Sequence, residues 1–232
     1  MLDPHGYLNT NLMGTLNLLE LCRSTKTYKF VLASTSSLYG ETYSNLIAES
    51  YPTDSPLTPY SVSKKSAELL CYSYHHQYNI DISINRYFTV YGQFGRPDMS
   101  IFKFIKLINE GGTLTVFGDG SQTRDFTHVN DVATGTIKSL EKVGYQIFNL
   151  GSNNPVSVNQ VIALIEDKLG KTVQKKYMPR NSADVTSTYA DITKAQKILN
   201  WVPKVSFEDG IQMTIDWYMA NTDWLDTIII DS

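Results

Sequence analysis

Cysteine is scarce in this sequence: only Cys22 and Cys71 occur among 232 residues, each within a helix-like apolar pattern. Cysteines placed in this way are typical of small buried side chains in a reducing compartment, so we expect no disulfide and a cytoplasmic protein. Purely aliphatic runs such as residues 228–230 are far shorter than the ~20 apolar residues that cross a bilayer. The first residues also lack the basic and apolar regions of a signal peptide. We therefore expect no membrane association.

An excess of positive charge is absent as well. The chain has 20 Lys and Arg residues against 23 Asp and Glu residues, a formal net charge of −3. Proteins that bind nucleic acid neutralise phosphates with basic side chains, so this composition disfavours a nucleic-acid partner. The adjacent His75 and His76 lack the spacing and partners of metal ligands, and we expect a solvated helix surface there and no metal site.

The apolar period of the sequence switches repeatedly between helix and strand, which is typical of an α/β protein. The start of one helix is also indicated, because Thr58 is a good N-cap and Pro59 suits the first helical position. The first half predicts a helix from Leu8 to about Cys22, a strand at Phe30–Ala33, a helix from Tyr60 to about Tyr78, and a strand from Ile80 to near Phe88.

The second half alternates in the same way and ends in a loop-rich region. It predicts a helix across Ile101–Ile108, strands at Leu114–Phe117, Asp125–Val129 and Tyr145–Leu150, a helix capped by Asn130, a helix capped by Ser157, and helical stretches around Ala195 and Ile211. We expect a sheet core followed by a C-terminal lobe.

Tyr60 and Lys64 form the strongest candidate for chemistry. Residues four apart lie on one helix face, so the Lys64 ammonium is expected to lower the pKa of the Tyr60 phenol from its usual value near 10. Such a phenol becomes a usable acid or base near neutral pH. The alternative is an ordinary helix start with an exposed tyrosine and lysine, because this spacing often arises by chance.

A cluster of hydroxyl groups follows the first predicted strand, in the segment Ser34–Gly40. Ligands of open parallel sheets bind at the carboxyl ends of strands, which makes this cluster a candidate site. Serine and threonine clusters also cap and turn the chain, and that reading stays open for the cluster alone.

Several motifs together resemble one known family. They are A-S-T-S-S-L-Y-G at 33–40, Y-x-x-x-K at 60–64, R-Y-F-T-V-Y-G at 86–92, G-D-G-S-Q-T-R-D-F at 118–126 and Y-A-D at 189–191. In this order they resemble the extended short-chain dehydrogenases/reductases that act on nucleotide sugars, the NAD-dependent epimerase/dehydratase family. The motif G-Q-F-G-R-P-D-M at 92–99 is similar to the UDP-glucuronate 4-epimerase branch of that family.

The resemblance implies the C-terminal part of a Rossmann-like doubly wound parallel sheet plus a smaller α/β substrate-binding lobe. Residues 1–90 with 125–150 would form a partial NAD-binding domain, and residues 91–124 and 151–232 a nucleotide-sugar-binding lobe. The 14 glycines include no glycine-rich phosphate loop after an N-terminal strand. At ~30 residues per βαβ step, roughly three units of the fold are expected to be missing. Residues 1–232 alone are then expected to bind NAD weakly, to lack activity and to be poorly soluble.

The resemblance also implies roles for individual residues. Tyr60 would take the proton of the sugar 4-hydroxyl, Lys64 would hold the nicotinamide ribose, and Thr35 would stand at the catalytic serine or threonine position. Thr10 and Phe88 match positions that contact the cofactor NAD.

Substrate contacts are implied at other positions. Thr89, Arg124 and Asp184 match positions near the diphosphate and uridine of a UDP-sugar. Asp184 matches less closely, because Ala183 replaces the usual glycine and Asn181 stands where some relatives have arginine.

Ser36 and Ser37 distinguish this chain from the dehydratases of the family, which have Asp-Glu at these positions. Two neutral hydroxyls can donate to a carboxylate without repelling it. With Thr89 and Arg96 they would form a cradle for the C6 carboxylate of a uronic acid. For Arg96 the alternative is a surface pair with a nearby acid.

The predicted activity is 4-epimerisation of UDP-glucuronate to UDP-galacturonate through a 4-keto intermediate, with NAD as cofactor and a homodimer in the full-length protein. Two alternatives stay open. The chain could be a catalytically incompetent substrate-lobe or dimerisation module, or an epimerase for another nucleotide sugar such as UDP-glucose.

Overall fold

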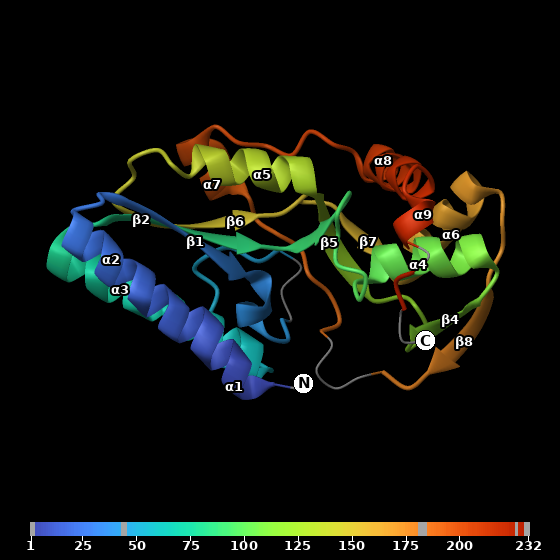
Figure 1. Cartoon of the computed structure of the whole chain (residues 1–232), viewed down its shortest axis with the longest axis horizontal. Coiled ribbons are helices and arrows are strands. Elements are labelled where there is room, and N and C mark those ends of the chain that lie inside the picture. The colour runs from blue at the N-terminus through green and yellow to red at the C-terminus, as the bar shows by residue number, and fades with distance from the viewer. Residues whose placement is uncertain (1–2, 43–45, 181–184, 226, 230–232) are drawn as a thin grey trace.

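A computed structural model describes residues 3–42, 46–180, 185–225 and 227–229. Its main sheet is parallel and lies between two helical layers, with α2 and α3 on one face and α5 and α7 on the other (Figure 1). The strands in sheet order are β1 (Lys29–Thr35), β2 (Asp81–Tyr87) and β6 (Tyr145–Leu150). The covering helices are α2 (Gly14–Thr25), α3 (Pro59–Tyr78), α5 (Val129–Lys138) and α7 (Thr193–Leu199). The prediction of an α/β fold is confirmed.

Helix α3 begins where the sequence predicts. The Thr58 side chain caps it by accepting a hydrogen bond from the Ser61 amide at 3.2 Å, and Pro59 occupies the first turn. Asn79 ends the helix in the left-handed conformation, with φ of 54°. The cap fixes the register of the helix, so it also fixes which side chains of the first two turns face the sheet.

The first helical region differs from the single helix that the leucine spacing predicts. A short α1 (Pro4–Tyr7) and α2 are joined by a π-helical segment, η1 (Leu8–Met13). Within η1 the Asn11 side chain donates to Ser63 Oγ of α3 at 3.0 Å, and Asn11 O accepts from the Thr15 hydroxyl at 2.6 Å. Wide turns of this kind concentrate at functional sites, and here the segment packs against the start of α3.

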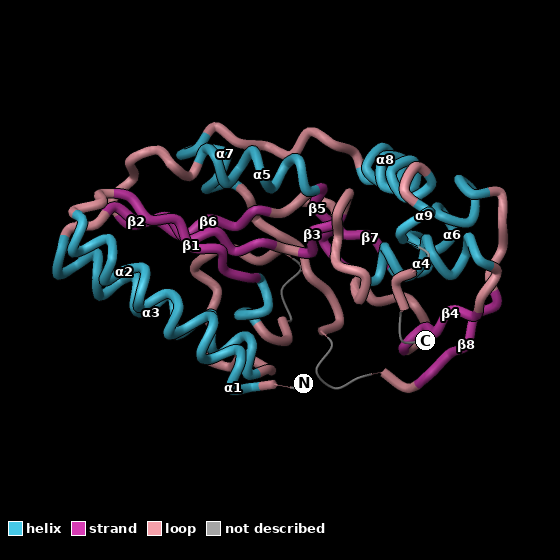
Figure 2. Tube along the Cα trace, viewed as in Figure 1, coloured by secondary structure: helices cyan, strands magenta, loops and turns pink. Residues whose placement is uncertain are grey.

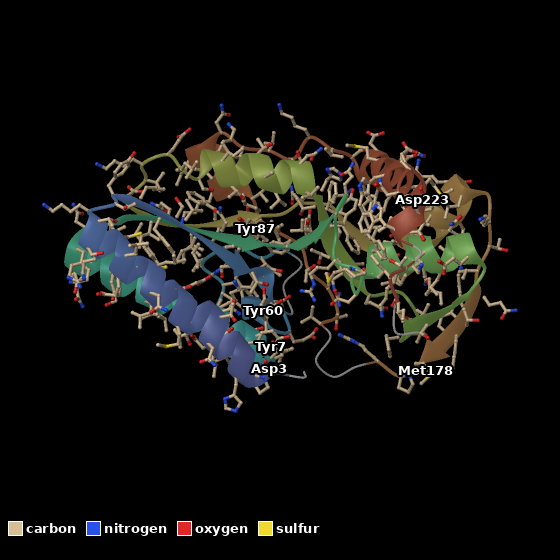
Figure 3. The ribbon with its side chains drawn as sticks, in the orientation of Figure 1. Asp3, Tyr7, Tyr60, Tyr87, Met178 and Asp223 are labelled. Carbon is tan, nitrogen blue, oxygen red and sulfur yellow. The ribbon has the colours of Figure 1, made fainter. Side chains whose placement is uncertain are left out.

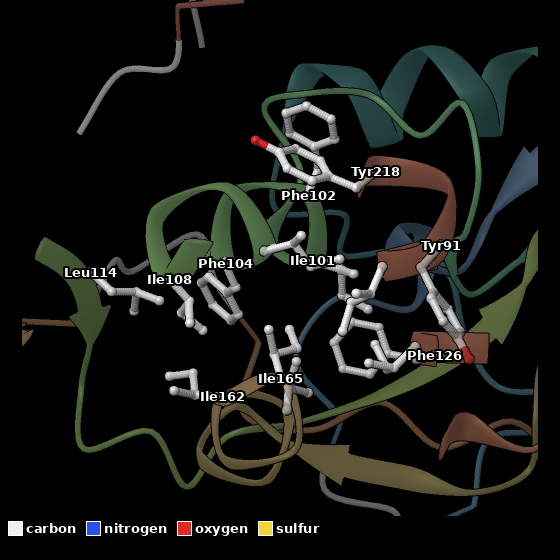
Figure 4. Close-up of a cluster of buried hydrophobic side chains, with 14 of the residues drawn as sticks. Tyr91, Ile101, Phe102, Phe104, Ile108, Leu114, Phe126, Ile162, Ile165 and Tyr218 are labelled. Carbon is white, nitrogen blue, oxygen red and sulfur yellow. The ribbon is translucent and has the colours of Figure 1, made fainter. Parts of the chain in front are cut away.

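A second group of elements surrounds α4 and holds the largest apolar cluster, part of which Figure 4 shows. Residues from α4, α6 and α8 interdigitate there, among them Phe104, Ile108, Ile162 and Ile165. The elements of this half are β3 (Thr89–Tyr91), α4 (Ser100–Glu110), β4 (Thr113–Phe117), β5 (Thr123–His128), β7 (Pro155–Ser157), α6 (Val158–Leu169), β8 (Gln174–Met178), α8 (Phe207–Met219) and α9 (Thr222–Leu225). Figure 2 shows their strands as two small sheets, β3-β5-β7 and β4-β8.

Two features of this half correct the sequence prediction. The cap of α5 is His128, whose Nδ1 accepts from the Asn130 amide at 3.3 Å, so the prediction that Asn130 is the cap was wrong. Strand β8 has the sequence Q-K-K-Y-M and is exposed along its whole length, which leaves no apolar alternation to predict it.

Cys71 is buried on α3 and Cys22 is half-buried on α2, and both are free thiols. Burial raises the pKa of the Cys71 thiol to about 12. Across the described ranges of the chain, no helix combines the length and the apolar character that a membrane span requires.

Thr58→Ala is expected to lower the free energy of unfolding by about 1 kcal/mol, because the Ser61 amide loses its acceptor. Urea unfolding followed by circular dichroism measures this change. Thr58→Ser keeps the acceptor and serves as the control, with stability close to that of the parent. Equal losses in both variants would show that the cap hydroxyl contributes nothing.

Candidate functional site

The carboxyl end of β1 leads directly into a short 3₁₀ helix, η2 (Ser36–Tyr39), that presents hydroxyl groups at the edge of the sheet. Thr35 caps this turn: its Oγ1 accepts from the Ser37 amide at 3.1 Å and donates to Ser37 Oγ at 3.1 Å. Thr35 is 8% exposed, whereas Ser37 is exposed and Ser36 half-buried. The turn and the candidate site therefore use the same hydroxyls, so the two readings of this cluster do not exclude each other.

The first two turns of α3 place Tyr60 and Lys64 against this strand end. The Tyr60 phenol lies close enough to Thr35 for that hydroxyl to lower the pKa of the phenol. Lys64 Nζ donates to the carbonyl oxygen of Ala33 at 3.0 Å. The Tyr7 ring of α1 packs edge-on against the Tyr60 ring with centroids 5.5 Å apart, and Figure 3 shows the two side chains together.

The electrostatics of Tyr60 differ from the prediction. Burial raises the pKa of Tyr60 above its usual value, and the hydrogen bond from Thr35 and the charge of Arg96 offset this rise only in part. In the ligand-free protein, the groups that lower the pKa of Tyr60 are Thr35 and Arg96, so the prediction that Lys64 lowers it was wrong. Burial also lowers the pKa of Lys64, whose ammonium is directed to a backbone carbonyl.

Thr89 and Arg96 line one small cavity beside this edge of the sheet, together with Gly95 and Phe102. Arg96 Nε donates to Asp98 Oδ1 at 3.0 Å, and the hydrogen bonds from Arg96 hold the pKa of the Asp98 carboxyl below its usual range. The Arg96 side chain is 75% exposed. The structure confirms the alternative for Arg96, a surface pair with a nearby acid, and the charge of Arg96 also acts on Tyr60. Binding of a substrate carboxylate by Arg96 stays a prediction.

Arg124 lies at the start of β5, where its guanidinium binds backbone carbonyls. Nη1 donates to Thr123 O at 2.7 Å and Nη2 donates to Val185 O at 2.6 Å. Asp184, the other predicted diphosphate contact, lies outside the described residues. The next residue of β5, Asp125, is fully buried and accepts from the amides of Ser152 (2.5 Å), Asn153 (3.0 Å) and Ala190 (3.0 Å). These bonds hold the chain beside Arg124 to the loop that follows β6 and to Ala190.

The two predicted cofactor contacts lie in different surroundings. Thr10 is exposed on η1, which packs on α3. Phe88, between β2 and β3, is only 4% exposed and its ring lies against Tyr39, with centroids 6.3 Å apart. The structure therefore places the Phe88 side chain in the core, while Thr10 is accessible. In the described part of the chain, no group of three or more His, Cys, Asp or Glu side chains could hold a metal ion.

Comparison with known proteins adds to this geometry. A family model described as GDP-mannose 4,6 dehydratase matches residues 1–214. A UDP-glucuronate 4-epimerase of Thermodesulfobacterium geofontis is 50% identical over 227 residues, which cover 97% of this chain and 70% of that protein. The chain belongs to the NAD-dependent epimerase/dehydratase family.

Solved structures of this family superpose closely on the chain. A UDP-glucuronic acid 4-epimerase from Bacillus cereus, solved with UDP-glucuronic acid and NAD, has a TM-score of 0.89 at 40% identity, and the match covers 95% of this chain and 70% of that one. A UDP-glucose 4-epimerase from Thermotoga maritima, solved with UDP-glucose, has a TM-score of 0.90 at 30% identity, covering 95% and 72%. These matches confirm the Rossmann-like fold class, and the chain spans about 70% of these relatives.

Sequence reasoning missed two residues that bond to the strand end and the η2 turn of this site: Glu68 accepts from Ser34, and Arg86 donates to Tyr39. Glu68 lies two helical turns beyond Tyr60 on α3, and Arg86 lies on β2. Both are almost fully buried. A signal was present, since Tyr60, Lys64 and Glu68 repeat every fourth residue along one helix face.

In the ligand-free protein, the Tyr60 phenol is expected to titrate above the usual tyrosine pKa of 10, since burial outweighs the groups that favour the phenolate. Arg96→Gln should raise this pKa further by removing a positive charge. Carbon-13 NMR of labelled tyrosine, with Tyr60→Phe to assign the signal, measures it. Arg23→Gln, at an exposed pair with Glu20 on α2, is the control. A Tyr60 pKa below 10 would contradict the conclusion that burial dominates the electrostatics of this phenol.

Proposed function

We propose that the protein is an NAD-dependent UDP-sugar 4-epimerase that interconverts UDP-glucuronate and UDP-galacturonate. The observation that supports this most strongly is the placement of Tyr60 and Lys64 at the carboxyl end of β1, where Thr35 lowers the pKa of the Tyr60 phenol and Lys64 Nζ donates to Ala33 O. The identity of 50% to a protein named UDP-glucuronate 4-epimerase supports the same substrate. Ser36 and Ser37 support epimerisation over dehydration, because they place hydroxyls where dehydratases need acids.

The residues beside Tyr60 suit the nicotinamide half of NAD. Among the described residues, the Lys64 ammonium makes one hydrogen bond, to Ala33 O, which leaves donors for ribose hydroxyls. Thr10 is accessible from η1, on the side of α3 that carries Tyr60. When bound, NAD would accept the hydride from the sugar C4 and return it later. Phe88 contributes through its backbone, because its side chain is buried.

Tyr60 receives the proton of the sugar 4-hydroxyl and returns it after the 4-keto sugar has rotated in the pocket. Tyr60 must be a phenolate to accept this proton. Burial raises its pKa and opposes that form, whereas Thr35 and the charge of Arg96 favour it. The η2 turn holds the Thr35 hydroxyl in place beside the phenol. Lys64 positions the ribose and keeps the strand end in place.

The C6 carboxylate of the uronic acid would bind Ser36, Ser37, Thr89 and Arg96. Thr89 and Arg96 line one cavity, whereas Ser36 and Ser37 lie on η2 outside its lining; the charge of Arg96 reaches Tyr60. A neutral cradle with one guanidinium attracts a carboxylate, whereas a glutamate at position 37 would repel it. In the absence of substrate, Asp98 pairs with Arg96, so the substrate carboxylate competes with Asp98 for this side chain.

The remaining assignments concern the nucleotide and the assembly. Arg124 and Asp184 would bind the diphosphate and uridine, with residues 91–124 and 151–232 as the sugar-nucleotide lobe and residues 1–90 with 125–150 as the cofactor domain.

We propose a cytoplasmic homodimer. The large apolar residues exposed on α2 and α3 support it: Leu18, Leu21, Leu69 and Tyr72 are each more than 50% exposed.

Tyr60→Phe is expected to lower kcat for UDP-glucuronate by about 10²–10⁴-fold with little effect on KM, because it removes only the proton acceptor. Chromatography of UDP-galacturonate formed over time measures it. Tyr28→Phe, at a tyrosine that is 73% exposed, is the matched control and should retain full activity. Turnover of Tyr60→Phe near the parental rate would remove Tyr60 from the mechanism.

Arg96→Ala is expected to raise KM for UDP-glucuronate by about tenfold or more, since a hydrogen bond to a charged group contributes about 1.5–3 kcal/mol. The same variant should release more decarboxylated pentose product, because the carboxylate of a β-keto acid is no longer held. UDP-glucose has no carboxylate and serves as the control substrate. If the unmutated protein prefers UDP-glucose, the uronate assignment is wrong.

A further inference from the structure

The interior of the molecule beneath the site holds one ion pair with unusually complete hydrogen bonding. Arg86 Nε donates to Glu68 Oε1 at 3.0 Å and Nη2 donates to Glu68 Oε2 at 2.7 Å, so the pair is bidentate. Each side chain is 3% exposed. Burial alone would lower the pKa of Arg86, but its bonds to Glu68 and the nearby Tyr39 outweigh that effect and the pKa is raised.

The pair ties α3 to the end of β1 in a continuous register. Ser34 Oγ donates to Glu68 Oε1 at 2.6 Å. The carbonyl oxygen of the residue before it, Ala33, accepts from Lys64 Nζ, and the residue after it, Thr35, lies close enough to Tyr60 to lower its pKa. Three consecutive residues of β1 thus each face one of three successive turns of α3.

Arg86 also reaches the hydroxyl turn on the other side. Its Nη1 donates to Tyr39 OH at 3.0 Å, and the guanidinium lies over the Tyr39 ring at 5.0 Å from the centroid. Tyr39 is the last residue of η2, the turn that carries Ser36 and Ser37. Tyr39 OH in turn donates to Asn149 Oδ1 of β6 at 2.6 Å. One guanidinium therefore joins the catalytic helix, the hydroxyl turn and the sheet.

Stability gives a weak reason for such an arrangement. Removing two charges from water costs several kcal/mol per ion, and replacing a buried ion pair with apolar residues is often neutral or stabilising. A directional network, in contrast, fixes the relative position of the elements that it joins. The elements joined here are the ones that place Tyr60 beside Thr35.

We propose that Glu68 and Arg86 are positioning residues that hold α3 and η2 in the register required for catalysis by Tyr60. The proposal rests on the proposed function, because it concerns the geometry of the same site. Neither side chain reaches the substrate, since both are buried beneath Thr35 and Lys64.

The same sheet provides a matched control at its opposite end. Lys29 Nζ donates to Asp81 Oδ1 at 2.6 Å, and these side chains are 9% and 4% exposed. Lys29 faces Asp81 in the β1–β2 register, as Ser34 faces Arg86 five residues later. Glu68→Gln on α3 and Asp81→Asn on β2 therefore each remove one buried carboxylate whose cationic partner lies on this strand pair, one near the site and one far from it.

Steady-state kinetics of the two variants in the full-length protein test the proposal. Glu68→Gln should lower kcat for UDP-glucuronate by about ten- to a hundredfold with KM changed less than about twofold, because misplacement of a reacting group by 1 Å has effects of this size. Asp81→Asn should lose a similar amount of stability and keep kcat within about twofold. Equal kcat values for the two variants at matched folded fractions would overturn the proposal.

A double variant separates positioning from stability. Glu68→Met/Arg86→Met replaces the pair with apolar side chains of similar length and should regain thermal stability without regaining kcat. Recovery of both would show that the pair only stabilises the fold. Crystal structures of the parent and of Glu68→Gln give a readout that does not depend on activity: the distance between the Tyr60 and Thr35 hydroxyls should change in the variant, and an unchanged distance would contradict the proposal. If the parent itself fails to convert UDP-glucuronate, the proposed function fails, and these structures still decide the positioning role.

Discussion

The guanidinium of Arg86 is the point on which the main sheet and its site depend. A buried guanidinium needs a partner for nearly every donor, and here those partners come from α3, η2 and the segment before α3, since Nη1 also donates to Glu49 O at 3.2 Å. Meeting this requirement brings together three parts of the chain that are distant in sequence. The hydroxyls of Thr35, Ser36 and Ser37 and the first turns of α3 then meet at one edge.

The two ends of the β1–β2 unit use buried charge for different purposes. At the amino end Lys29 and Asp81 close the sheet, and Asp81 Oδ2 also accepts from the Gly144 amide at 2.5 Å. At the carboxyl end the ion pair lies beneath polar side chains that are half-buried or exposed, such as Lys64 and Ser37. Parallel sheets bind ligands at this second end, so the Glu68–Arg86 pair supports the surface that we propose for catalysis.

Local sequence signals predicted the elements that carry their own start and stop residues. Thr58 and Pro59 marked α3, and β6 lies at Tyr145–Leu150 as predicted. The π-helical turn escaped prediction because the leucine spacing over residues 8–19 is the same for a regular helix. Strand β8 has no buried face, and its pairing with β4 supplies the order that its sequence does not encode.

The sequence indicated which residues gather at the candidate site, but not their electrostatics. Tyr60 and Thr35 were singled out from spacing and from the resemblance, and the structure places them close together, while their roles stay predictions. The pKa of Tyr60 depends on burial and on Arg96, which is 36 positions away, so spacing along one helix could not give its sign. The Glu68–Arg86 contact likewise forms only when α3 packs on β2.

The central claim is that Tyr60 handles only the hydroxyl proton at C4 while the hydrogen on that carbon never reaches water. UDP-glucuronate carrying deuterium at C4, incubated with the full-length protein in ordinary water, tests this directly by mass spectrometry and proton NMR of the product. The account predicts UDP-galacturonate that retains the deuterium at C4. Product that has exchanged its label for solvent hydrogen would contradict it, because the carbon-bound hydrogen would then have left as a proton.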